Sequence, residues 1–155
     1  MGMVAYLKLD GIPGSVEVTG REETVEVIAF NHSVHLPVNE LDGSITGNRR
    51  HGALEIVKVF DKASPLLYEA LVNGKEIAEV ALSWYRIDTA TGAEENYFEH
   101  KMEMVRVVSI EPFMLNCHQH PDMQHMERVR FKYRKITWTW LPDNIEKSDS
   151  WTEER

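Results

Sequence analysis

Residues that can bind metal ions are concentrated in one short segment near the end of the chain. They are one cysteine and three histidines, Cys117, His118, His120 and His125. Thiolate and imidazole are ligands that zinc takes in its tetrahedral protein sites. The spacing argues against such a site, because a single residue separates His118 from His120 and the expected second ligand pair is missing. We predict a polar loop between two strands, with no bound metal and no cofactor.

A second candidate for chemistry is His100, which lies in a predicted strand close to Glu99 and Glu103. A histidine beside a carboxylate can act as a general base. Alternate residues of a strand face opposite sides, however, so the two glutamates share a face that His100 does not. The chain also has no G-x-S-x-G elbow, no Gly-rich phosphate loop and no H-E-x-x-H pair. We therefore predict no catalytic residue and expect that the protein is not an enzyme.

The composition is that of a single folded domain. The chain has 155 residues, of which 43% are hydrophobic and 27% are charged. That length can bury one good core, and the composition is typical of globular proteins. The formal net charge of −8 at pH 7 repels the polyanionic backbone of nucleic acid. We expect one domain over residues 1–155, ending in a polar C-terminal extension at 143–155, and no nucleic-acid partner.

The sequence shows neither an export signal nor a membrane span. The N-terminal residues MGMVAYLKLDGIPG have no basic region followed by a long apolar run. Charges interrupt every hydrophobic run well before the ~20 residues that a membrane helix requires. The lone cysteine excludes an internal disulfide, which fits a reducing compartment. We expect a protein that is made in the cytoplasm and does not insert into a membrane.

Alternation with a period of two residues is the commonest pattern in the chain and predicts strands. The predicted strands cover residues 5–9, 24–30, 54–60, 77–87, 97–110 and 128–140. Segment 24–30 has apolar residues on both faces, as in a strand that is covered on both sides. In segment 128–140 the apolar residues change parity after Tyr133. That change indicates a bulge, or a strand that passes from one buried environment to another.

One segment, SPLLYEALVNG, has the features of a helix. Ser64 suits the N-cap, Pro65 suits the first helical position, and Gly74 suits the left-handed position after the helix. Many strands and one capped helix predict a mainly β fold. Its predicted architecture is an antiparallel β-barrel with one flanking α-helix.

A long segment at residues 31–52 separates the second and third predicted strands and has no sustained period. Loops of this length in compact domains are usually functional or disordered. The segment contains five apolar residues that are poorly suited to water, namely Val34, Leu36, Val38, Leu41 and Ile45. One interpretation is an extended arm that reaches a neighbouring subunit. The other is a strand that continues through Leu36 and ends in a mobile tip.

Three blocks of the sequence resemble, in order and spacing, the signature segments of the Hcp (haemolysin-coregulated protein) family of type VI secretion. The blocks are AYLKLDGIPGS, ALEIVKVFDKASPLLYEAL and VRFKYRKITWTW. The resemblance covers essentially the whole chain. One departure lies at residues 15–20, where family members often carry an acidic residue followed by a Ser-rich loop. This departure concerns only the details of the first loop.

The resemblance implies a structural protein. Six copies close into a ring with a wide channel, and the rings stack into the inner tube of a contractile injection machine. The tube is propelled out of the cell, and its channel can shelter effector proteins. The implied partners are further copies of the chain, the spike, sheath and baseplate of the machine, and effectors. Export occurs through the type VI system, without a cleaved signal peptide.

A ring of this kind requires two different complementary surfaces on each subunit. Candidate contacts are the basic residues Arg128, Arg130, Lys132 and Arg134, which share one strand face, and acidic stretches at residues 22–23 and 94–95. The alternative is that these charges are only solvated surface, where ion pairs contribute little. A competing function class is a small-molecule or metal-binding β-barrel of the cupin or lipocalin type. The mass of the particle in solution separates the two classes.

Overall fold

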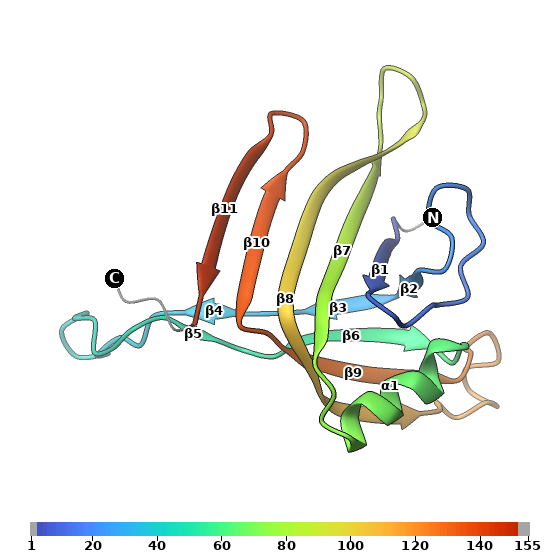
Figure 1. Cartoon of the computed structure of the whole chain (residues 1–155), viewed down its shortest axis with the longest axis horizontal. Helices are drawn as coiled ribbons and strands as arrows, with labels where there is room; N and C mark the ends of the chain where they lie inside the picture. Colours follow the sequence, from blue (N-terminus) through green and yellow to red (C-terminus); the bar gives the residue numbers. More distant parts are fainter. Residues whose placement is uncertain (1–2, 152–155) are drawn as a thin grey trace.

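The computed structural model describes residues 3–151 and confirms a mainly β, antiparallel fold with one flanking helix (Figure 1). In chain order the elements are β1 (Ala5–Leu9), β2 (Val25–Val27), β3 (Ala29–Asn31), β4 (Val34–His35), β5 (Arg50–His51), β6 (Leu54–Val59), α1 (Ala63–Val72), β7 (Ile77–Ile87), β8 (Glu94–Phe113), β9 (Met126–Lys132), β10 (Lys135–Trp140) and β11 (Ile145–Ser150).

The main sheet curves into an open barrel. Within residues 3–151 its two end strands do not pair with each other and are joined only by the chain. Its strands follow the order β2-β1-β7-β8-β9-β6-β3. The end strands β2 and β3 are separated only by Ile28, whose backbone N–H donates to the carbonyl of Val57 at 2.8 Å. Ile28 is 49% exposed, whereas Val25 and Val27 are buried and Phe30 packs against the core. The predicted single strand at 24–30 is thus two strands, because the chain changes partner, and side-chain parity, at Ile28.

Strand β8 is 20 residues long and belongs to both halves of the barrel. One edge pairs with β7, and the other edge pairs first with β10 and then with β9. The bend between these two partners includes Met104, which has a φ of 53°. The parity change predicted after Tyr133 is confirmed, because β9 ends at Lys132 and β10 begins at Lys135 along a different part of β8.

The barrel interior is filled with side chains that alternate along the strands. Leu7, Ile56, Leu82, Met102 and Phe131 are all 0% exposed. Such close packing of apolar side chains is the main source of stability in a domain of this size. The filled interior differs from the hollow barrel of a cupin or lipocalin, which encloses a ligand.

Helix α1 buries Ala63, Leu67 and Ala70 on one face. The predicted N-cap at Ser64 is wrong, because the helix begins at Ala63 and the Asp61 carboxylate accepts the Ala63 N–H at 3.0 Å. Gly74 follows the helix as predicted, with a φ of 61°. The N–H groups of Gly74 and Lys75 donate to the carbonyls of Leu71 and Ala70, which completes a Schellman motif.

Residues 31–52 form an ordered, extended arm that projects away from the barrel (Figure 1). Strands β4 and β5 pair at its base, and Val38 and Ile45 form a further bridge toward the tip. The C-terminal extension also contains a strand, because β11 pairs along the whole of β10. Residues 152–155 of that extension lie outside the described part of the chain.

Candidate functional site

The tip of the arm exposes apolar side chains. Leu41 is 97% exposed, Ile45 63% and Val38 53%. Closer to the barrel, Val34 and Leu36 are also exposed. All five apolar residues selected from the sequence therefore lie on the arm and are poorly covered by their own chain.

The tip is nevertheless held in one shape by its own polar groups. The Asn39 side-chain oxygen accepts the N–H of Leu41, and the Asp42 carboxylate accepts the N–H of Ser44, both at 2.9 Å. Gly43 has a φ of 76°, a conformation that glycine adopts without a steric penalty. A preformed turn loses less conformational entropy on binding than a mobile loop does.

A chain of hydrogen bonds joins the base of the arm to the barrel. The Tyr133 hydroxyl lies 2.9 Å from His32 Nε2 and 2.6 Å from His51 Nδ1. His51 Nε2 lies 2.7 Å from the Asp149 carboxylate, which also accepts two bonds from Arg49 at 2.9 and 2.8 Å. We call His32, Arg49, His51, Tyr133 and Asp149 the base cluster.

The base cluster collects residues that are distant in sequence. His32 follows β3, and Arg49 and His51 belong to the returning chain of the arm. Tyr133 lies at the corner between β9 and β10, and Asp149 lies in β11. Both chains of the arm are therefore tied to the barrel and to the last strand. The sequence analysis missed this cluster, because no local spacing relates residue 51 to residues 133 and 149.

Burial and charge set the protonation of these groups. Hydrogen bonds from Arg49 are the main reason that the pKa of Asp149 lies below its usual value. Burial, with additional repulsion from His51 and Lys132, lowers the pKa of His32. Burial lowers the pKa of the neighbouring His100 to about 4. Around neutral pH these two histidines are therefore uncharged.

The Tyr133, His51 and Asp149 side chains are arranged like a nucleophile, a base and an orienting acid. Tyr133 is 3% exposed and His51 is 6% exposed. A substrate has no access to groups that are buried to this extent. The arrangement is therefore suited to holding the arm in place, and we assign it no catalytic role.

The predicted row of basic residues lies against acidic residues of its own chain. Arg128 and Arg130 both lie within 4.0 Å of Glu55 and Glu111. Lys132 donates to the His51 carbonyl at 3.2 Å and lies over the Trp151 ring, whereas Arg134 is exposed.

The acidic stretch at residues 94–95 is also paired, since Glu94 contacts Arg21 at 2.7 Å and Glu95 contacts Arg86 at 2.6 Å. The charges of Arg128 and Arg130, and those of Glu94 and Glu95, are thus paired within one chain.

The cysteine and histidine segment is an exposed loop between β8 and β9. Cys117, His118, His120 and His125 are all exposed, and the His125 ring packs 6.1 Å from the Phe60 ring. Across residues 3–151, no three or more His, Cys, Asp or Glu side chains are grouped so that they could hold a metal ion.

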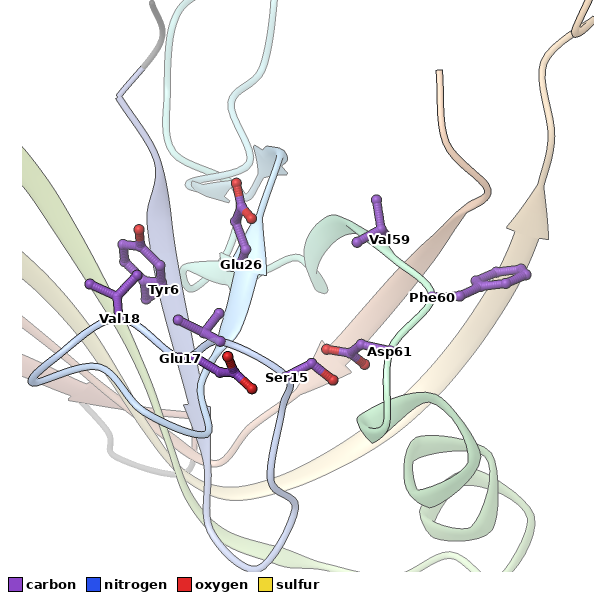
Figure 2. A pocket seen from close by; sticks show the side chains of 9 residues that line it. Tyr6, Ser15, Glu17, Val18, Glu26, Val59, Phe60 and Asp61 are labelled. Carbon is purple, nitrogen blue, oxygen red and sulfur yellow. The ribbon is translucent and has the colours of Figure 1, made fainter. Parts of the chain in front are cut away.

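A surface cavity of about 350 Å³ lies between the first loop and the end of β6 (Figure 2). The carboxylates of Glu17, Glu26 and Asp61 line it together with Tyr6 and Ser15. Asp61 is already bonded to Lys58 at 3.0 Å and to the start of α1. The cavity is open to solvent, and acidic side chains alone do not define a ligand.

Comparison with known proteins identifies the family. The model of the family described as "Type VI secretion system effector, Hcp" matches residues 6–140. The chain belongs to the Hcp family. A relative named "Major exported protein" from Pseudomonas aeruginosa is 41% identical over 140 residues, which cover 89% of this chain and 81% of that protein.

Solved structures of Hcp proteins have the same fold. The Hcp1 protein of E. coli is 38% identical and superposes with a TM-score of 0.84, covering 97% of this chain and 99% of that one. The Hcp3 protein of Pseudomonas aeruginosa is 34% identical with a TM-score of 0.77, covering 98% of this chain and 100% of that one. The resemblance of the three sequence blocks to this family is thus confirmed.

Within the described residues of this Hcp protein, no helix has the length and apolar character to cross a membrane.

Proposed function

We propose that this Hcp protein is a structural subunit of the type VI secretion inner tube. Six copies close into a ring, and the rings stack into a tube that is propelled out of the cell with effector proteins in its channel. The arm is the observation that carries this proposal. Its tip holds Leu41 in water at 97% exposure on an ordered turn. Covering apolar side chains stabilises a complex by about 25 cal/mol per Å² of buried apolar surface.

The position of the arm favours contact with another copy. A head-to-tail ring or stack uses two different surfaces of each subunit, and a projecting element is suited to provide one of them. The arm extends away from the barrel, so its tip is remote from its own core (Figure 1). Arg128 and Arg130 already pair with Glu55 and Glu111 of their own chain. We therefore expect the basic residues to influence how neighbouring subunits align more than how tightly they bind each other.

The proposal also covers partners and location. The subunit is made in the cytoplasm and leaves through the type VI system without a cleaved signal peptide. It contacts the spike, sheath and baseplate of the machine, and it turns over no substrate. Family membership and the filled barrel interior support this assignment against a ligand-binding barrel.

The mass of the particle tests the function directly. Six chains of 17.9 kDa have a combined mass of about 107 kDa. We expect light scattering to give this mass across micromolar concentrations, without added metal or nucleotide. Negative-stain electron microscopy should show annular particles. A monomeric mass at all of these concentrations contradicts the proposal.

A second test separates folding from assembly. The tip variant Val38→Thr, Leu41→Ser, Ile45→Ser removes the apolar tip and retains Arg49, which a larger deletion would separate from Asp149. We expect unchanged far-ultraviolet circular dichroism together with weakened rings or stacks. The matched control is Val72→Ser, Ile87→Ser, which alters two apolar residues that are 75% and 58% exposed elsewhere. If the tip variant forms the same rings and tubes as the wild type, the arm does not mediate assembly.

A further inference from the structure

A second exposed apolar surface lies where β6 and β8 end and β9 begins. It is a shallow groove of about 390 Å³, which we call the barrel groove, and it is lined by Phe60, Pro112, Phe113, Met114 and His125. Phe60 is 50% exposed and Met114 is 62% exposed, although both side chains are large and apolar. Contiguous apolar surface of this kind marks sites where soluble proteins bind a partner.

The barrel groove is held in one shape by its own chain. The Phe60 N–H donates to the His125 carbonyl at 3.2 Å, and the two rings lie 6.1 Å apart. Phe113 pairs with Met126 in the ladder between β8 and β9, which fixes the opposite wall. The Phe60 side chain points away from that of Asp61, which lines the neighbouring acidic cavity (Figure 2). A preformed groove loses less conformational entropy on binding than a mobile one does.

The barrel groove and the arm tip lie at opposite ends of the molecule (Figure 1). They therefore cannot cover each other within one chain. A head-to-tail contact requires two such surfaces, different in shape and far apart on each copy. We propose that the arm tip of one copy docks in the barrel groove of another copy. This inference rests on the proposed function, because it names the surface that receives the tip.

The distribution of charge favours this groove over the acidic cavity beside it. The arm tip carries the exposed carboxylates of Glu40 and Asp42. The carboxylates that line the acidic cavity repel them, whereas the lining of the barrel groove contains no carboxylate. At the edge of the groove the Arg128 guanidinium lies 4.6 Å from the centre of the Phe113 ring. The tip carboxylates are thus expected to face Arg128.

The contact with Arg128 orients the tip more than it strengthens binding. Arg128 already pairs with Glu55 at 3.2 Å and with Glu111 at 3.6 Å. A further exposed carboxylate adds little affinity to such a pair. The apolar side chains of the tip and of the groove are therefore expected to supply most of the affinity.

Thiol cross-linking between chains tests the docking directly. The variant Leu41→Cys, Met114→Cys in a Cys117→Ser background places one thiol on the tip and one in the barrel groove. After treatment with a short bis-maleimide, a denaturing gel should show a ladder of linked chains. We expect at least ~10-fold more linked product than for Leu41→Cys, Ile87→Cys, because docking holds two thiols at one site. Ile87 is the matched control, since it is 58% exposed and lies at the end of β7.

The outcomes separate this inference from the proposed function. If light scattering gives the mass of six chains but the Met114 pair links no better than the Ile87 pair, the docking site is wrong and the function stands. Linked dimers of Leu41→Cys alone would show contact between two tips, which also overturns the docking site. A monomeric mass of the wild type at all concentrations overturns both the function and the docking.

Two complementary variants provide an independent test. The groove variant Phe60→Ser, Met114→Ser retains an intact tip, whereas the tip variant retains an intact groove. Each variant lacks one half of the contact, so we expect both to assemble more weakly than the wild type, with unchanged far-ultraviolet circular dichroism. Mixed in equal amounts, they should form larger particles than either forms alone, because one groove can receive the other tip. Wild-type assembly of the groove variant, or no gain in mass on mixing, overturns the proposal.

Discussion

The barrel and the arm use the same residue types in opposite environments. Leu7 in the barrel is 0% exposed, and Leu41 on the arm is 97% exposed. Burial of leucine stabilises the fold of its own chain, whereas an exposed leucine contributes nothing to that fold. The comparison shows that the apolar residues of the arm are not explained by the folding of this chain. We propose that another copy of the chain provides the surface that covers them.

The two regions also differ in the polar clusters that hold them. Inside the barrel, Lys58 is 0% exposed and bonds to Glu127, Asp61 and Ser64, which joins β6, β9 and α1. At the arm, the base cluster joins the two chains of the arm to Tyr133 and Asp149 through hydrogen bonds. The barrel cluster is centred on a buried ion pair, whereas the base cluster lies where the arm meets the barrel.

The largest expected effect comes from breaking the barrel cluster. Lys58→Met leaves the Glu127 carboxylate, which is 1% exposed, without its cation. Breaking a buried ion pair in this way typically costs about 3–5 kcal/mol of unfolding free energy. Urea unfolding followed by circular dichroism measures the loss. Lys75→Met, which alters an exposed lysine, is the control and should change stability by less than about 0.5 kcal/mol.

Replacing both partners sharpens this prediction. Lys58→Met combined with Glu127→Leu removes the isolated charge and should recover much of the lost stability. A Lys58→Met protein that is as stable as the wild type would show that the cluster does not hold the barrel together.

A smaller effect is expected from pH. Burial lowers the pKa of His100 from 6.5 to about 4, so the folded barrel keeps this histidine neutral while the unfolded chain binds a proton. The unfolded state then binds more protons, and stability must fall as the pH is lowered from about 6.5 toward about 4. The loss is at most about 3 kcal/mol, and solvent around this partly exposed side chain reduces it further.

The pH dependence is assigned by substitution. His100→Gln can still accept the Trp84 indole N–H, which now lies 2.9 Å from His100 Nδ1. Urea unfolding at about pH 7 and about pH 5 should show a smaller pH dependence for this variant than for the wild type. His118→Gln, in the exposed loop, should retain the full dependence. If the unfolding free energy of His100→Gln depended on pH as strongly as that of the wild type, groups other than His100 would cause the dependence.

A pair of glycine substitutions should distinguish the barrel from the arm through smaller changes in stability. Gly74 after α1 and Gly43 at the arm tip have positive φ values of 61° and 76°. Alanine is strained in this conformation, by roughly 1 kcal/mol. Gly74→Ala should therefore lower the free energy of barrel unfolding by about this amount. Gly43→Ala should leave the free energy of barrel unfolding unchanged and increase hydrogen exchange at residues 39–46. If both substitutions lowered the free energy of barrel unfolding equally, the arm and the barrel would not be energetically separate.

Elements with local signals were predictable from the sequence. The alternation of β6 follows from one buried face, and Gly74 marks the end of α1 by its left-handed conformation. The apolar residues of the arm are exposed, as expected of a long segment without a period that offers no face on which to bury them. Their role as subunit contacts stays a prediction.

Features that depend on distant partners were not predictable. Strand β11 is polar, so its order comes from pairing with β10 and not from its own pattern. The base cluster joins His51 to Asp149 across 98 positions of the chain, and the pairing of Arg128 with Glu111 depends on the register of β8 against β9. A single sequence carries no local sign of such contacts.

The central claim is that another copy of the chain covers the arm tip, and thiol labelling tests it most directly. Leu41→Cys in a Cys117→Ser background places the one thiol at the most exposed apolar position of the tip. We expect it to react at least ~10-fold more slowly in assembled protein than in dissociated protein, because burial slows access to the thiolate. Val72→Cys on α1 in the same background reports the reactivity of an exposed apolar position away from the arm. Equal labelling rates at position 41 in assembled and dissociated protein would contradict the claim.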